Sequence, residues 1–180
     1  MEQVYRAHRQ PFEWRESKMV AHQDELHADH QILATLRWKG VGNGVASTLA
    51  FAVSPEGQWI FEQPGIFSRD VQVRNAGSDA PVALFRPHWI GAGGRLDFAD
   101  NRAFYWTAMN FGQTRWAFTS ASGKQLVRFE NDVQRVPAGA LVMVEPSILE
   151  SLALPACECA LLMLLGRYLM VLKKRDAATP

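Results

Sequence analysis

Residues 155–172 read Pro155-Ala156-Cys157-Glu158-Cys159-Ala160-Leu161-Leu162-Met163-Leu164-Leu165-Gly166-Arg167-Tyr168-Leu169-Met170-Val171-Leu172, an almost uniformly apolar run. The run begins with a proline and is followed by Lys173-Lys174-Arg175. Proline is favoured at the first position of a helix, and cations at the C-terminus complement the helix dipole. The pattern therefore predicts an α-helix over about 155–172. Because nearly every face of this helix is apolar, it is either enclosed by protein or spans a bilayer.

The bilayer alternative has two difficulties. A run of about 18 residues lies at the lower edge of the length that crosses about 30 Å of hydrocarbon. Glu158 and Arg167 interrupt the run on opposite faces of the helix, about 13 Å apart along its axis, so they cannot neutralise each other. Near the middle of a bilayer, Arg167 would cost several kcal/mol. We expect a helix enclosed by protein, in which Arg167 reaches the mouth of the enclosure or meets a carbonyl or carboxylate there, and keep a membrane protein anchored by this helix as an alternative.

The part of the chain from about residue 12 to residue 144 is divided by turn residues about every 8 to 12 positions. Between the turns lie short runs rich in aromatic and β-branched residues. In one run, Ile32, Ala34, Leu36 and Trp38 alternate with Thr35, Arg37 and Lys39 on the other face. Other predicted strands include 59–62, 82–85, 103–108, 115–119, 125–130 and 140–144. We predict about a dozen antiparallel strands and then a short helix over about 146–152.

A single open sheet of a dozen strands would normally curl or close, because closure removes its exposed edges. We therefore predict a mainly β protein, a closed antiparallel barrel of about twelve strands around the hydrophobic C-terminal helix. The chain has 180 residues, so barrel, helix and a tail over 173–180 are expected to form one domain over 1–180.

The composition excludes some partner classes. The formal net charge is +1 and 48% of the residues are apolar, so there is no broad basic field for the phosphates of nucleic acid, which is not expected as a partner. Residues 1–10 lack the apolar segment of a secretory signal, and we expect a cytoplasmic protein. The two cysteines, Cys157 and Cys159, are too close together for an ordinary disulfide and too few for a zinc site.

Four segments resemble the tubby-like superfamily, which includes the plant LURP-one-related proteins and the phospholipid scramblases. They are Ile32–Trp38, Gly57–Phe61, Ala83–Trp89 and Leu161–Leu172, and the resemblance covers about residues 12–175. It implies a closed barrel of about twelve strands around a central hydrophobic helix, and a non-enzymatic module. Tubby proteins bind membrane phosphoinositides and scramblases associate with membranes. No basic cluster on a strand-turn-strand matches that lipid site, so no binding residue is carried over.

His22, His27 and His30 form the one cluster of potential metal ligands, interleaved with Asp24, Glu25 and Asp29. Imidazole and carboxylate around a hairpin could hold a divalent cation such as zinc. The spacing, however, lacks the His-Glu-x-x-His pattern that places two ligands on one helical face, and crowded polar residues usually mark a solvated turn. We therefore predict neither a metal nor another cofactor, and keep a small metal-dependent enzyme using these three histidines as an alternative.

The sequence contains no catalytic signature. Gly40-x-Gly42-x-Gly44 lacks the further glycine of a dinucleotide fingerprint, and neither a phosphate loop nor a Gly-x-Ser-x-Gly elbow is present. The six tryptophans, Trp14, Trp38, Trp59, Trp89, Trp106 and Trp116, are expected to fill the barrel. Both cysteines are expected to be inert core residues.

The expected function is a non-catalytic binding or scaffold module, peripheral to a membrane rather than integral to it. Its expected partner is an anionic lipid surface or another protein. Lys173, Lys174 and Arg175 form the one basic run and are the candidates for contact with anionic lipid, at about 1 kcal/mol per cation.

Overall fold

The computed structural model describes residues 12–40, 47–65, 68–90, 92–132, 139–144 and 154–178. The strands are β1 (Phe12–Glu16), β2 (Gln23–Ala28), β3 (Gln31–Trp38), β4 (Ala50–Ser54), β5 (Gly57–Glu62), β6 (Val71–Asn75), β7 (Pro81–Pro87), β8 (Gly93–Phe98), β9 (Ala103–Ala108), β10 (Arg115–Ser120), β11 (Gln125–Asp132) and β12 (Gly139–Val144), and the helix is α3 (Ala156–Ala178). The predicted short helix over 146–152 lies outside the described residues, as do Gly42 and Gly44 of the glycine-rich loop.

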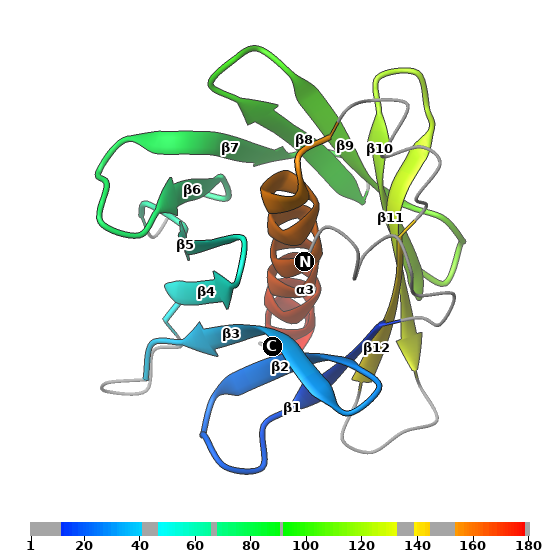
Figure 1. Ribbon diagram of the computed structural model, residues 1–180. Coiled ribbons are helices and arrows are strands. Elements are labelled where there is room, and N and C mark those ends of the chain that lie inside the picture. Colours follow the sequence, from blue (N-terminus) through cyan, green and yellow to red (C-terminus); the bar gives the residue numbers. More distant parts are fainter. Residues whose placement is uncertain are drawn as a thin grey trace.

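The strands form a closed antiparallel barrel in which each strand pairs with its neighbours along the chain. The last strand closes the ring by pairing with the first, with Phe12 opposite Val142 and Trp14 opposite Ala140. Figure 1 shows α3 inside this ring of strands. The prediction of a twelve-stranded barrel around the C-terminal helix is therefore confirmed.

Aromatic side chains fill much of the space between the strands and α3. Five of the six tryptophans are buried, as predicted: Trp14, Trp38, Trp59, Trp106 and Trp116. The prediction is wrong for Trp89, which is 91% exposed. This residue follows the end of β7 and lies in the loop that leads to β8, where the side-chain alternation of a strand no longer applies.

A bulge in β3 overturns a second prediction. The pair Leu26–Ala34 is followed by His27–Ile32, so Leu33 is an extra residue on β3. The extra residue reverses the alternation, and Leu33 turns inward while Ile32 is 53% exposed. The predicted inward face of this strand is correct for Ala34, Leu36 and Trp38.

Every residue of α3 from Cys159 to Met170 is buried. The helix packs so closely against the barrel that a Cβ on Gly166 would overlap the ring of Phe129, which explains a glycine at this position. Cys157 is exposed, so the expectation of a core residue is wrong for this cysteine and correct for Cys159. No helix within the described ranges has the combination of length and apolar character that a bilayer span requires.

The helix is longer than predicted. It continues to Ala178, so Lys173, Lys174 and Arg175 belong to its last turns and not to a tail. The predicted end at Leu172 followed the end of the apolar run, but lysine and arginine are good helix formers and propagate an established helix.

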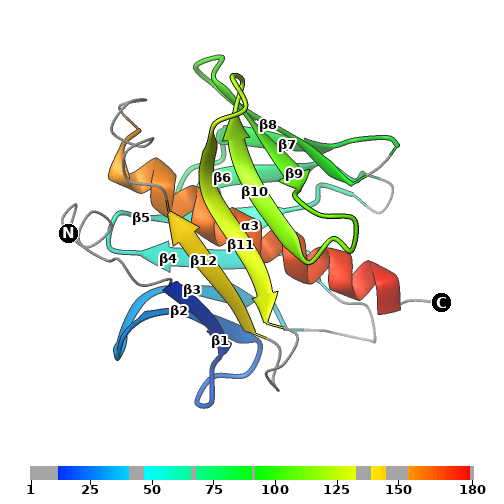
Figure 2. The same cartoon turned by 90° about the vertical axis from the view of Figure 1, so that its right-hand side faces the viewer.

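The antiparallel order gives the barrel two distinct ends. Loops that follow odd-numbered strands lie at one end, and loops that follow even-numbered strands lie at the other. Glu158 in the first turn of α3 contacts Arg102 in the loop after β8, whereas Lys173 near the other terminus contacts Gln113 in the loop after β9. We call these the Glu158 end and the Lys173 end. Figure 2 shows α3 running along the barrel between them, with the last turns of the helix at the Lys173 end.

Candidate functional site

The three histidines predicted as metal ligands do not come together. His22 lies in the turn before β2, and His30 lies in the turn after it, so these two are at opposite ends of the barrel. A strand of this length separates them by about 25 Å. His27 lies on β2 between them. Within the described ranges, no three His, Cys, Asp or Glu side chains are close enough to share a metal ion.

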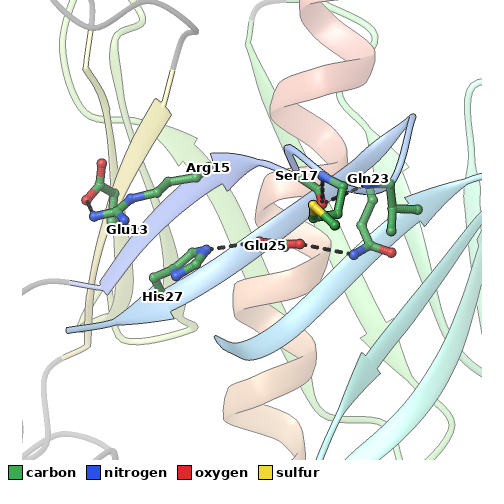
Figure 3. Close-up of polar contacts among 8 residues, drawn as sticks. Glu13, Arg15, Ser17, Gln23, Glu25 and His27 are labelled. Atoms are coloured by element: carbon green, nitrogen blue, oxygen red, sulfur yellow. Dashed lines mark hydrogen bonds and ion pairs between the residues drawn. The ribbon is translucent and has the colours of Figure 1, made fainter. Parts of the chain in front are cut away.

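A row of polar contacts on β1 and β2 includes His27 (Figure 3). His27 Nε2 lies 3.2 Å from Glu25 Oε2, and the Gln23 amide donates to Glu25 Oε1 at 3.3 Å. A hydrogen bond from the Ser17 hydroxyl is the largest cause that lowers the pKa of Glu25, and the bonds with His27 and Gln23 act in the same direction. At the far end of the row, Arg15 donates to Glu13 at 2.6 Å.

The order of groups in this row does not suit nucleophilic catalysis. In a catalytic triad the imidazole lies between the hydroxyl and the carboxylate, so that it can accept the hydroxyl proton. Here Glu25 contacts both Ser17 and His27, and its lowered pKa makes it a weaker base. Only the bond between Ser17 and Glu25 joins the end of β1 to β2, since the other contacts lie within one strand, and the row provides no activated nucleophile.

Arg167 of α3 is buried and forms an ion pair with Asp24 of β2. Its Nη2 donates to Asp24 Oδ1 at 2.6 Å, whereas its Nε finds no acceptor among the described residues. The expectation that Arg167 meets a carboxylate is confirmed, but the pair is buried and not at the mouth of the barrel, where it was expected. Since both partners are less than one-tenth exposed, the pair joins the centre of the helix to the barrel wall out of reach of most water.

At the Glu158 end, ionic contacts fasten the helix to the barrel. Arg102 donates to both carboxylate oxygens of Glu158, at 2.7 and 2.6 Å, and to Asp100 at 2.8 Å. These bonds, first that to Glu158 and then that to Asp100, raise the pKa of Arg102. A paired guanidinium of this kind is geometrically specific, because two parallel hydrogen bonds fix its plane.

At the Lys173 end, aromatic rings replace the carboxylates. Lys173 Nζ lies 4.2 Å from the ring centre of Trp116, and the Arg175 guanidinium lies 3.9 Å from that of Trp38. Burial lowers the pKa of both cations from their ordinary values. Two of the three predicted lipid contacts, Lys173 and Arg175, therefore contact the barrel, although Lys173 remains exposed; Lys174 is exposed and has no partner within the described ranges.

A stack of rings continues from the Arg175 contact into the barrel. Trp38 stacks on Tyr168 with ring centres 4.9 Å apart, and the Tyr168 hydroxyl donates to the Thr48 carbonyl at 2.6 Å. Burial raises the pKa of Tyr168 above its ordinary value. The Arg175 guanidinium therefore covers the stacked rings of Trp38 and Tyr168, and this stack closes the Lys173 end of the barrel.

Exposed apolar side chains gather on the loops of the Lys173 end. Five of the exposed large hydrophobic residues lie there: Met19, Trp89, Ile90, Met109 and Phe111. Of the others, Phe51 and Val53 lie on β4, and Ile32 lies beside the turn at the Glu158 end. Exposed hydrophobic residues scattered over a surface are ordinary, but a concentration at one end marks a contact surface.

The charges follow the same division. The described loops and helix residues of the Lys173 end carry six cations, Lys18, Lys39, Arg69, Lys173, Lys174 and Arg175, and two carboxylates, Asp70 and Asp176. Those of the Glu158 end carry five carboxylates, Asp29, Glu56, Asp79, Asp100 and Glu158, and two cations, Arg102 and Lys124. One end is apolar and basic, and the other is polar and acidic.

The sequence indicated the basic run but not the loop residues that accompany it. Trp89 and Ile90 stand directly before Gly91-Ala92-Gly93-Gly94, a glycine-rich turn signal that could have marked them as loop residues. Nothing local to Asp24 or Arg102 indicates that they bind α3, because each lies more than fifty positions from its partner. Comparisons with protein-family models, with curated proteins and with solved structures found no match for this chain.

Proposed function

We propose that this protein is a non-catalytic binding module of tubby-like fold that docks its Lys173 end on an anionic membrane surface from the cytoplasmic side. The fold part of the proposal is supported by the closed barrel of twelve strands with a buried C-terminal helix. The observation that carries the docking part is the concentration of exposed apolar side chains and cations on the loops of one end.

The two kinds of side chain supply the two signals that stable peripheral binding requires. Tryptophan and isoleucine at loop tips can enter the boundary between headgroups and acyl chains. There the Trp89 ring contacts acyl chains while its indole N–H stays among polar groups. Each lysine or arginine near an anionic surface adds about 1 kcal/mol. Neither signal alone anchors a protein well, but together they do.

The cation–ring contacts make Lys173 and Arg175 secondary in this proposal. Each of these cations would have to leave the ring of Trp116 or Trp38 to reach a headgroup. The loss of that cation–ring contact would offset part of its attraction to lipid. Lys18, Lys39, Arg69 and Lys174 are exposed and form no ion pair within the described ranges, so they are the principal cations of the proposed surface.

The test is sedimentation of the protein with vesicles of phosphatidylcholine, with and without phosphatidylserine. Wild-type protein should bind the phosphatidylserine vesicles at about 0.15 M salt, because apolar insertion is not screened. The double variant Trp89→Ser/Phe111→Ser should bind at least about tenfold more weakly at every salt concentration. The double variant Lys18→Gln/Lys174→Gln should bind more weakly, with the larger loss at low salt.

The matched control is Ile32→Ser, which removes an exposed hydrophobic side chain from the Glu158 end. This variant should bind vesicles as the wild type does. The proposal fails if wild-type protein does not sediment with phosphatidylserine vesicles, or if Ile32→Ser weakens binding as much as the loop variant does.

A further inference from the structure

The outer wall of β2, β3 and β4 contains a hollow of about 440 Å³ close to the Lys173 end. Its lining includes Gln23, Thr35, Arg37, Lys39, Phe51 and Val53. The edge of the hollow at Trp38 and Lys39 is fixed by backbone hydrogen bonds. Trp38 N donates to the His22 carbonyl and Lys39 N donates to the Leu49 carbonyl, both at 2.9 Å. The hollow is therefore framed by paired strands rather than by side chains alone.

The floor of the hollow is apolar because β4 turns its larger side chains outward. Ala50 and Ala52 face the barrel interior, where α3 leaves little room, whereas Phe51 and Val53 are 42% and 41% exposed. The barrel core does not use these two side chains. Large apolar residues facing solvent on a strand, beside a hollow, suit a ligand with an apolar part.

Polar groups stand directly beside this floor. Phe51 lies opposite Arg37, and Val53 lies opposite Thr35, so each apolar side chain has a polar neighbour about 5 Å away across the strands. A ligand that fits both must be apolar on one side and polar on the other.

Arg37 and Lys39 are exposed and form no ion pair within the described ranges. Six other arginines of the barrel each pair with a carboxylate: Arg15, Arg74, Arg86, Arg95, Arg102 and Arg115. The carboxylate of Glu25, which lies opposite Thr35 across β2 and β3, is already engaged by Gln23 and His27. The hollow thus presents two cations whose charge no carboxylate neutralises in the described part of the protein.

We propose that this hollow binds a small amphipathic carboxylate, a molecule with one carboxylate headgroup and a short apolar chain. The headgroup lies between Arg37 and Lys39 within reach of the Thr35 hydroxyl, and the chain covers Phe51 and Val53. A guanidinium suits a carboxylate because two parallel hydrogen bonds can form. The hollow has the size of ordinary small-molecule sites. This site shares Lys39 with the Lys173 end but does not depend on the membrane-docking function.

The test uses decanoate at concentrations where it is monomeric, titrated by calorimetry and by amide chemical shifts. Wild-type protein should bind decanoate saturably, with shifts at residues of β3 and β4. Arg37→Gln should weaken binding about tenfold or more, because it removes a charge-assisted hydrogen bond. Val53→Asp should abolish binding, since it places a carboxylate on the floor, whereas the near-isosteric Val53→Thr should retain it.

Two further controls isolate charge and place. Methyl decanoate, which has the same chain without the charge, should bind to the wild type at least as weakly as decanoate does to Arg37→Gln, because it loses its attraction to both Arg37 and Lys39. Arg95→Gln, an exposed arginine on β8, should bind decanoate normally. All substituted side chains are at least partly exposed, so thermal unfolding should show that each variant folds.

Failure of wild-type protein to bind decanoate would overturn the proposal. Binding of decanoate by Arg37→Gln and Val53→Asp with the affinity of the wild type would overturn it too. The vesicle experiment separates this site from the proposed function. Trp89→Ser/Phe111→Ser should keep its affinity for decanoate, and Arg37→Gln should keep most of its affinity for vesicles. Loss of vesicle binding alone would therefore count against the docking end and not against the hollow.

Discussion

The two ends of the barrel are closed by different chemistry. At the Glu158 end, Arg102 holds Glu158 and Asp100 through hydrogen bonds between opposite charges. At the Lys173 end, Lys173 and Arg175 lie on tryptophan rings. Both arrangements fasten the helix to the wall, but only the first uses a carboxylate to do so.

The difference has a consequence for the surface charge. An ion pair neutralises the cation that it holds, whereas an aromatic ring holds a cation and leaves its charge in place. The Lys173 end therefore keeps a positive field together with its exposed apolar loops. Fastening by rings allows one end of the barrel to be closed and still attract anions.

The largest expected effect lies between the two ends, at Arg167. Arg167→Met leaves the Asp24 carboxylate buried without its partner and should lower the free energy of unfolding by about 3–5 kcal/mol. The double variant Asp24→Leu/Arg167→Met removes both charges and should recover most of that loss. Urea denaturation measures both. If the double variant is as unstable as the single variant, the loss does not come from an unpaired buried carboxylate, and the expectation is wrong.

A smaller effect compares the ends directly. Glu158→Gln removes one partner of a half-exposed ion pair and should cost about 1 kcal/mol, less in high salt. Lys173→Gln removes a cation from the face of Trp116 and should cost about 0.5 kcal/mol. Urea denaturation at low and high salt checks both, with Lys174→Gln as the neutral control. Equal salt dependence of the two losses would contradict the division into ionic and aromatic closure.

The smallest effect concerns the two thiols near the Glu158 end. Burial raises the pKa of Cys159 to about 12, so this thiol is neither ionised nor accessible near neutral pH. Cys157 is exposed. A disulfide reagent should therefore titrate one thiol in the folded protein and two in denaturant, and Cys157→Ser should leave stability unchanged. Rapid reaction of both thiols without denaturant would mean that the first turns of α3 open readily.

Much of the architecture was predictable from local patterns. The apolar run from Leu161 to Leu172 identifies the enclosed helix, because its composition leaves no face for water. Turn residues at regular spacing identify the strands and their antiparallel order. The predictions failed where one local feature changes the pattern, as at the bulge beside Ile32 and in the loop that carries Trp89.

The sequence by itself therefore determined a barrel, a buried helix and the presence of a basic run, since each depends on the periodicity or composition of neighbouring residues. The tertiary structure decided which charges are used and which stay free. Arg167 meets Asp24, Arg175 covers Trp38, and Arg37 has no carboxylate partner within the described ranges. These outcomes depend on strand register and on the rotation of the helix inside the barrel, which bring together residues more than a hundred positions apart. No pattern of adjacent residues records those distances.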